Sequence, residues 1–248
     1  MPQNHDRLIA LEGAHNVRDL GGYPKGRGGH TRWRRLFRGD ALHALTPQDM
    51  ETLVGHGLAT VIDLRNAKEI AAEANPFSQH DQVRYVNIPL FQALSPVELM
   101  AAAVPEFDMG ERYCHALDHC QSAIAEVLTT IAQSSNGGLL FHCSAGKDRT
   151  GIIAALLLAN AGVEASVIIE DYVLTASISG PLIPHLRARA VSRGLDNGLI
   201  DIILASEPAS MARALAHIDS SYGDCETYLR HIGLGATDIS ALQQTLCD

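Results

Sequence analysis

The stretch from residue 138 to residue 151 holds the two residues whose types and spacing are best suited to chemistry. Cys143 and Arg149 are separated by five residues in the segment GLLFHCSAGKDRTG. A thiolate is a strong nucleophile, and a guanidinium fork binds two oxygens of a phosphate at once. Of the five cysteines in the chain, only Cys143 has an arginine six positions later. The spacing predicts nucleophilic attack on a bound phosphate group.

The residues around this pair predict a loop between a strand and a helix. Residues 138–142 form an apolar run that is typical of a short strand, and residues 150–161 favour a buried helix. Amide groups of the loop and of the first helical turn can then point at a common centre, which suits a dianionic phosphate. Their positive field favours the thiolate form of Cys143. Gly146 permits a backbone conformation that other residues resist, and Gly151 lets the helix approach its neighbours closely.

Strand and helix signals alternate through the elements that must position this loop. Thr46 followed by Pro47 and Asp49 predicts the start of a helix that runs to about His56. Strands are predicted at 36–38, 60–64 and 83–88, and helices at 113–131, 210–220, 225–231 and 237–246. We therefore expect an α/β fold with a central, mostly parallel sheet flanked by helices and a helical C-terminal third.

Composition limits the class of protein. The 248 residues include 19 Lys and Arg against 28 Asp and Glu, a net charge of −9, and 46% of them are hydrophobic. This length is typical of one α/β domain, 1–248, and the acidic balance argues against nucleic-acid binding. No basic start followed by an apolar run marks a secretory signal, and no run approaches the roughly 18 apolar residues of a membrane span. We expect a cytoplasmic protein without integral membrane contact and without a disulfide framework.

The segment HCSAGKDRTG, residues 142–151, resembles the signature loop of the cysteine-dependent protein tyrosine phosphatase superfamily, and it is similar to a bacterial branch of it. Four further segments resemble that branch in the same order, so that the resemblance spans nearly the whole chain. They are residues 16–23 (NVRDLGGY), 36–40 (LFRGD), 61–65 (VIDLR) with Glu69, and 222–229 (YGDCETYL). The resemblance implies a tyrosine-phosphatase-like fold and a phosphomonoester hydrolase that needs neither metal nor other cofactor.

The resemblance also implies roles for the loop residues. Cys143 attacks phosphorus and forms a phosphocysteine intermediate, while Arg149 and the loop amides stabilise the charge on the phosphate oxygens. His142 braces the loop. The expected substrate-binding residues are Ser144, Ala145, Gly146, Lys147 and Thr150, of which Thr150 can also hydrogen-bond the departing thiolate.

The general acid that protonates the leaving group is less clearly indicated. Dual-specificity relatives keep an aspartate after the strand that precedes the long helix, but here no carboxylate follows residue 88 before Glu98. In the resembling branch the aspartate directly before the signature arginine is the proposed acid, which corresponds to Asp148. Asp63 and Asp108 are the alternatives, although Asp63 is equally suited to orienting Arg65 or Arg38.

Other interpretations remain open from the residues alone. Cys143 could be a buried core thiol, and the Cys114–Cys120 segment carries two histidines but lacks a second cluster at zinc-finger spacing. A phosphate-binding module without turnover would be expected to have lost Cys143 or Arg149, and a rhodanese-like sulfur carrier would not need Arg149 and Thr150 together. We therefore favour a protein tyrosine phosphatase acting on a phosphorylated protein, with a phosphoinositide or dual- or triple-specificity phosphatase as the alternative.

Three features bear on the substrate. Lys147 would add positive charge for a second phosphate, or be a solvated lysine. The stretch from Lys25 to Arg38 holds six basic residues and no acid, and it is either a surface that steers anionic substrates or, as we favour, a solvated hairpin. Residues 92–109 and 177–198 are candidate lids over the pocket, or packing segments. The sequence does not indicate an oligomeric state.

Overall fold

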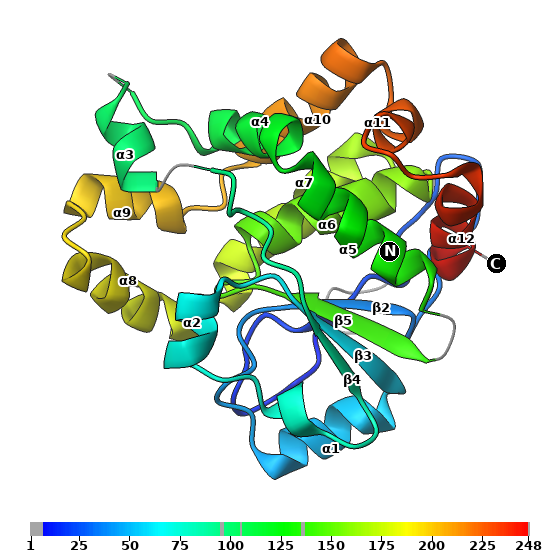
Figure 1. The fold of residues 1–248 in the computed structure, drawn as a ribbon, viewed down its shortest axis with the longest axis horizontal. Coiled ribbons are helices and arrows are strands. Elements are labelled where there is room, and N and C mark those ends of the chain that lie inside the picture. The colour runs from blue at the N-terminus through cyan, green and yellow to red at the C-terminus, as the bar shows by residue number, and fades with distance from the viewer. Residues whose placement is uncertain (1–6, 95–96, 105, 135–136, 248) are drawn as a thin grey trace.

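A mixed sheet lies at the centre of the computed structural model, which describes residues 7–94, 97–104, 106–134 and 137–247 (Figure 1). Its strand order is β1-β2-β5-β3-β4. Only β1 runs antiparallel to its neighbour, and the other pairs are parallel. The bounds are Arg18–Asp19 for β1, Leu36–Gly39 for β2, Leu58–Asp63 for β3, Arg84–Asn87 for β4 and Gly138–His142 for β5. The predicted fold class is confirmed, and of the strands in the described residues the sequence missed only the two-residue β1.

The register of the parallel strands brings their carboxyl ends to one edge. His142 at the end of β5 pairs with Gly39 of β2 on one side and with Asp63 of β3 on the other. Ligands of open α/β sheets bind in the crevice outside the carboxyl ends of the strands. The loop that starts at Cys143 therefore leaves the sheet where such a crevice is expected.

Helices cover both faces of the sheet (Figure 1). Side chains alternate along β5, so Leu139 and Phe141 pack in the larger core and Leu140 packs in the smaller one. The smaller core lies against α1 (Pro47–Gly55), whose Thr46 capping box is present as predicted, and against the 3₁₀ turn Pro76–Gln79. The larger core is formed with α4 (Met109–His119), α5 (Gln121–Ala132), α6 (Asp148–Asn160), α7 (Ala165–Ile178), α10 (Pro208–Tyr222), α11 (Cys225–His231) and α12 (Ala236–Leu246).

The long helix predicted over 113–131 is wrong, because two helices meet at Cys120. Its backbone (φ −105°, ψ 22°) ends α4 and begins α5. The first helix packs on α10 and the second on α12, so the break lets each face a different partner. No proline or glycine marks this site, and the amphipathic pattern continues across it.

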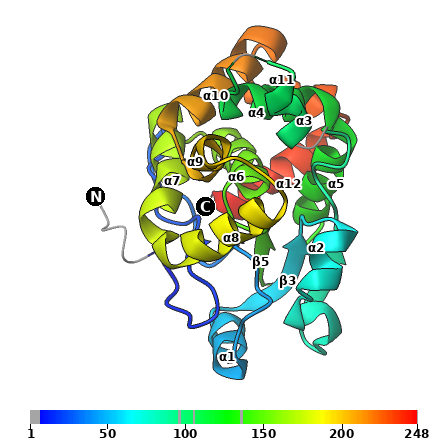
Figure 2. The same ribbon diagram turned by 90° about the vertical axis from the view of Figure 1, so that its left-hand side faces the viewer.

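Shorter helices complete the edge of the molecule near the carboxyl ends of the strands. They are α2 (Ala67–Ala72), α3 (Val97–Ala102), α8 (Ile183–Ser192) and α9 (Asn197–Leu204), with α8 and α9 side by side in both views (Figures 1 and 2). Within the described ranges no single helix has the length and apolar character to cross a membrane, and only α7 taken together with residues 180–192, bent by 53°, passes that test of length and composition.

The basic segment 25–35 lies at the other end of the sheet. Pro24 and His30 pair across a hairpin, Lys25 bridges to Val163, and the amide of Arg32 donates to the carbonyl of Leu246. No residue of this segment lines the pocket described below. The favoured prediction of a hairpin is confirmed, and only Arg38 of the basic stretch reaches the functional loop.

Candidate active site

The loop between β5 and α6 begins at Cys143, which is 2% exposed. Gly146 has φ +67°, and a Cβ there would lie 2.6 Å from the backbone oxygen of Gly39. The loop therefore passes so close to β2 that only glycine fits. Gly151 faces Tyr172 of α7, and a Cβ would lie 3.3 Å from that ring. Both glycines singled out in the sequence thus have a structural reason.

Every carbonyl of the loop from residue 143 to residue 147 has a hydrogen-bond partner in the surrounding protein. The donors are His142 Nδ1 to Cys143 at 3.1 Å, the Ala41 amide to Ser144 at 3.1 Å, Asn16 Nδ2 to Ala145 at 2.9 Å, Arg38 Nη2 to Gly146 at 2.7 Å, and the Gly151 amide to Lys147 at 2.7 Å. Because a carbonyl and the next amide N–H point in opposite directions, this outward binding turns the amides inward. The loop is an anion-binding nest.

A buried ion cluster fixes the arginine that binds Gly146. Asp171 of α7 pairs with Arg38 and, at 2.9 Å, with Arg18 Nε, and it accepts the Tyr23 hydroxyl at 2.8 Å. The charged side chains of this cluster are 1% exposed. Burial alone would raise the pKa of Asp171, but the two guanidinium groups hold it well below its usual value. The cluster explains why segments 16–23 and 36–40 belong to the site.

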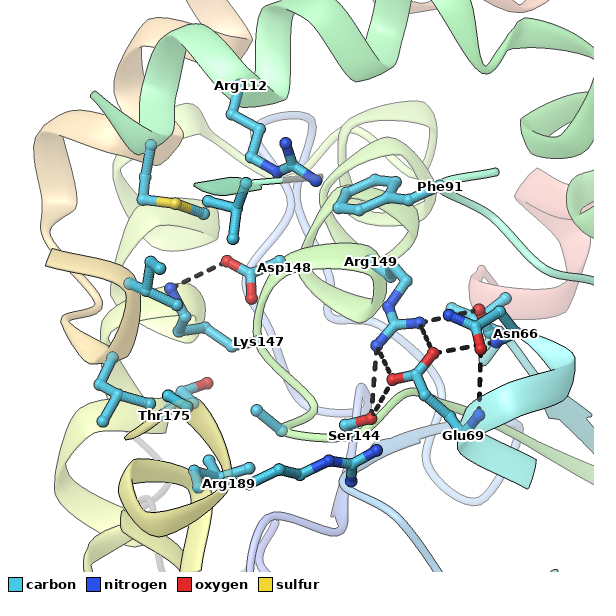
Figure 3. Close-up of a pocket in the computed structure, with 18 of the residues that line it drawn as sticks. Asn66, Glu69, Phe91, Arg112, Ser144, Lys147, Asp148, Arg149, Thr175 and Arg189 are labelled. Carbon is cyan, nitrogen blue, oxygen red and sulfur yellow. Dashed lines mark hydrogen bonds and ion pairs between the residues drawn. The ribbon is translucent and has the colours of Figure 1, made fainter. Parts of the chain in front are cut away.

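Arg149 is held by a carboxylate of α2. Its Nη1 and Nη2 lie 2.7 and 2.8 Å from the two oxygens of Glu69, as Figure 3 shows. The Ser144 hydroxyl donates to the same carboxylate at 2.5 Å. Burial acts to raise the pKa of Glu69, but these bonds lower it to about 2. Glu69 is a site residue that the chemistry of the sequence did not indicate, although the resemblance included it.

His142 is buried behind the loop as a neutral ring. The Asn75 amide donates to its Nε2 at 2.8 Å, so the proton is on Nδ1, which faces the carbonyl of Cys143. Burial lowers the pKa of His142 to about 4, although the charge of nearby Asp63 opposes this. The ring is a brace of fixed tautomer. No sequence feature predicted that Asn75 contacts His142.

The three candidate acids lie in different surroundings. Asp63 is fully buried, bonded to Arg65 at 2.7 Å and to the Tyr85 hydroxyl at 3.1 Å, and it does not line the pocket. Asp108 caps α4, pairs with Arg213 and is also outside the pocket. The structure therefore places Asp63 and Arg65 in the support behind the loop, and it places Asp148 alone of these three in the pocket wall.

Asp148 is 23% exposed and its Oδ1 lies 2.8 Å from Lys147 Nζ (Figure 3). Burial by itself would raise the pKa of Asp148, but the Lys147 ammonium lowers it below its ordinary value. Lys147 is 3% exposed and also donates to the carbonyl of Ala205 at 2.9 Å. Its charge belongs to the pocket wall, where it is paired, rather than to an open mouth.

The pocket above the loop has a volume of about 700 Å³. Both candidate lids contribute to its lining: Gln92, Leu94, Val97 and Met109 from the first, whose residues 95–96 and 105 lie outside the described ranges, and Ser179, Ile183, Leu186, Arg189, Ala190, Arg193 and Leu195 from the second. The Thr150 Oγ1, next to Arg149 in the chain, is buried without a partner among the described residues. Among the residues that the structure describes, no group of three or more His, Cys, Asp or Glu side chains could hold a metal ion.

Comparison with known proteins places these features in a family. The sequence matches the tyrosine phosphatase family over residues 9–248. A tyrosine-protein phosphatase from Nostoc commune is 34% identical over 215 residues, covering 83% of this chain and 71% of that protein. The triple specificity protein phosphatase PtpB of Mycobacterium tuberculosis is 27% identical over 280 aligned positions, covering 95% and 98%. The solved structure of P. aeruginosa TpbA with pTyr covers 82% of this chain and 88% of that one at 16% identity, with a TM-score of 0.41 that adds no weight.

An anion nest that begins at a cysteine and ends at an arginine is the site of a cysteine-dependent phosphatase. The chain belongs to the tyrosine phosphatase family. The resemblance seen in the sequence is confirmed, and with it the expectation of an enzyme that hydrolyses phosphomonoesters.

Proposed function

We propose that the protein hydrolyses phosphotyrosine in proteins through a phosphocysteine intermediate. One observation carries this proposal most directly: each loop carbonyl from residue 143 to residue 147 accepts a hydrogen bond that turns it away from the loop centre, so that the inward amides and Arg149 surround the space above Cys143. That arrangement suits the three equatorial oxygens of a phosphoryl group in transfer.

The reaction follows from this placement in two steps. The Cys143 thiolate attacks phosphorus, the bond from phosphorus to the ester oxygen breaks, and Asp148 gives its proton to the departing oxygen. Water then attacks the phosphocysteine, gives a proton back to Asp148 and releases inorganic phosphate and the thiolate. The Thr150 hydroxyl is buried and unpartnered among the described residues, which supports its proposed role as a donor to that thiolate.

The pocket lining also supports phosphoinositides as a second class of substrate. Besides Arg149 and Lys147, four cationic side chains line it: Lys68, Arg112, Arg189 and Arg193. A second anionic group on a substrate would meet positive charge there. The lipid activity is therefore the second candidate.

One panel of substrates tests both candidates. Wild type and Cys143→Ser are assayed in chelator on a phosphotyrosine peptide, a phosphoserine peptide and a soluble phosphoinositide. We expect turnover of the phosphotyrosine peptide by wild type and none by the variant. Activity that the serine variant keeps, or that chelator abolishes, would contradict the thiolate mechanism. A higher rate on the phosphoinositide would make the lipid the preferred substrate.

A further inference from the structure

Two buried tyrosines lie behind the carboxylate of Asp148. Tyr113 of α4 is 0% exposed and Tyr172 of α7 is 1% exposed. The Tyr113 hydroxyl donates to Asp148 Oδ1 at 2.5 Å and lies 2.8 Å from the Tyr172 hydroxyl. Because a hydroxyl has a single proton to donate, Tyr172 must supply the proton of the bond between the two tyrosines. The chain of hydrogen bonds therefore runs from Tyr172 through Tyr113 to Asp148.

Lys147 closes this chain into a ring. Its ammonium lies 2.8 Å from Asp148 Oδ1, donates to the Ala205 carbonyl at 2.9 Å, and interacts with the Tyr172 hydroxyl.

The ring distinguishes the two oxygens of Asp148. Oδ1 accepts from both Tyr113 and Lys147, whereas Oδ2 has no partner among the described residues. Asp148 lines the pocket and retains 23% of its side-chain surface. A proton on this carboxyl group therefore belongs on Oδ2, since Oδ1 already receives two donors.

We propose that Tyr113, backed by Tyr172, is a positioning residue for proton transfer by Asp148. Its hydroxyl holds Oδ1, so that Oδ2 delivers the proton to the leaving oxygen in the first step and receives one from water in the second. Neither tyrosine touches the substrate phosphorus. This inference rests on the proposed function with Asp148 as the general acid.

The surroundings of Asp148 give the proposal a pH signature. The charged and titratable groups that act on it are Lys147, Tyr113, Arg149 and Tyr172, and Arg112 lines the same pocket. Burial raises the pKa of Asp148, and Lys147 and the Tyr113 hydroxyl lower it. Loss of that hydroxyl therefore raises the pKa of Asp148 and moves the alkaline limb of the rate profile to higher pH. The maximal rate falls at the same time, because the carboxyl group loses its alignment.

The test compares Tyr113→Phe with Tyr228→Phe, a control that removes an equally buried hydroxyl bonded to the Leu117 carbonyl outside the pocket. The substrates are phenyl phosphate, with a poor leaving group, and p-nitrophenyl phosphate, with an activated one. We expect Tyr113→Phe to lower kcat roughly tenfold on phenyl phosphate and much less on the activated ester, a fraction of what a general acid supplies. Its alkaline limb moves upward, and the control changes neither quantity.

A second background separates positioning from folding. In Asp148→Asn, the further change Tyr113→Phe has no effect on the leaving-group dependence if the tyrosine acts through Asp148. Equal losses on both esters with an unmoved limb, or a full further loss in Asp148→Asn, would overturn the proposal. If Tyr113→Phe does not fold, Tyr172→Phe replaces it. We then expect a smaller upward shift of the alkaline limb, and an unmoved limb would contradict the proposal. Failure of the proposed function looks different, because wild type would then turn over neither ester.

Discussion

The ion cluster around Asp171 makes a strong prediction about the variant Asp171→Asn. The substitution preserves shape but leaves Arg18 and Arg38 buried with a neutral partner. Removal of one member of a buried charge cluster costs about 3–5 kcal/mol, because the remaining charges stay out of water without compensation. In a chain of this size 1 kcal/mol shifts Tm by about 2–4 °C, so Tm should fall by roughly 6–20 °C.

The matched control is Asp201→Asn, which breaks the pair with Arg187 on the surface. The Asp201 side chain is 66% exposed, so the loss should be less than about 1 kcal/mol. Thermal unfolding of both variants measures the stability difference. Because Arg38 also holds the carbonyl of Gly146, kcat of folded Asp171→Asn should fall as well. An Asp171→Asn variant that melts within 2 °C of wild type, or that keeps full kcat, would refute the account of the cluster.

Three further predictions concern the loop and its supports. Glu69→Gln should lose about 3 kcal/mol of stability at neutral pH, because the folded protein lowers the pKa of the Glu69 carboxyl group from 4.5 to about 2. It should also raise KM, because Arg149 loses its alignment. Urea unfolding and steady-state kinetics check both effects, with the exposed Glu226→Gln as the control. The pKa of His142 is about 4 in the folded protein and 6.5 in the unfolded chain, so between these pH values the unfolded chain binds the extra proton. The free energy of unfolding should therefore fall by about 3 kcal/mol as the pH drops from 6.5 to 4. Denaturation at a series of pH values measures this loss. Gly146→Ala should abolish inorganic phosphate binding in a calorimetric titration, because its Cβ would lie 2.6 Å from a backbone oxygen at a positive φ; unchanged affinity would contradict the loop geometry.

The sequence predicted the elements whose signals are local. The strand 138–142 and the helix that begins after Thr46 follow from an apolar run and a capping pattern, and both are present. The break at Cys120 was not predictable, because no residue there forces it and the cause is packing against α10 and α12. Helix α2 was missed since it is six residues long and has no buried face.

The residues of the candidate site likewise fall into those that a local motif predicted and those that depend on tertiary packing. Cys143, Arg149 and Gly146 lie within one short motif, so their spacing predicted a common loop. The partners of the Ser144, Ala145 and Gly146 carbonyls come from distant segments, and an asparagine or an arginine has no local feature that reports which carbonyl it binds. The ring around Asp148 likewise depends on how α4 and α7 cross α6, which follows from the packed core and not from any local pattern.

The hydrogen bonds to the loop carbonyls have a consequence for folding during synthesis on the ribosome. Asn16 and Arg38 bind residues 129 and 108 positions later in the chain, and Arg38 is held in turn by Asp171. Ribosomes add about 5–20 residues per second, so the early segments wait roughly 5–25 seconds for the loop that they will hold. A nascent chain that stops before Asp171 has the nucleophile but not the support that opens the nest to an anion. We therefore expect phosphatase activity only after Asp171 has been synthesised and has paired with Arg38.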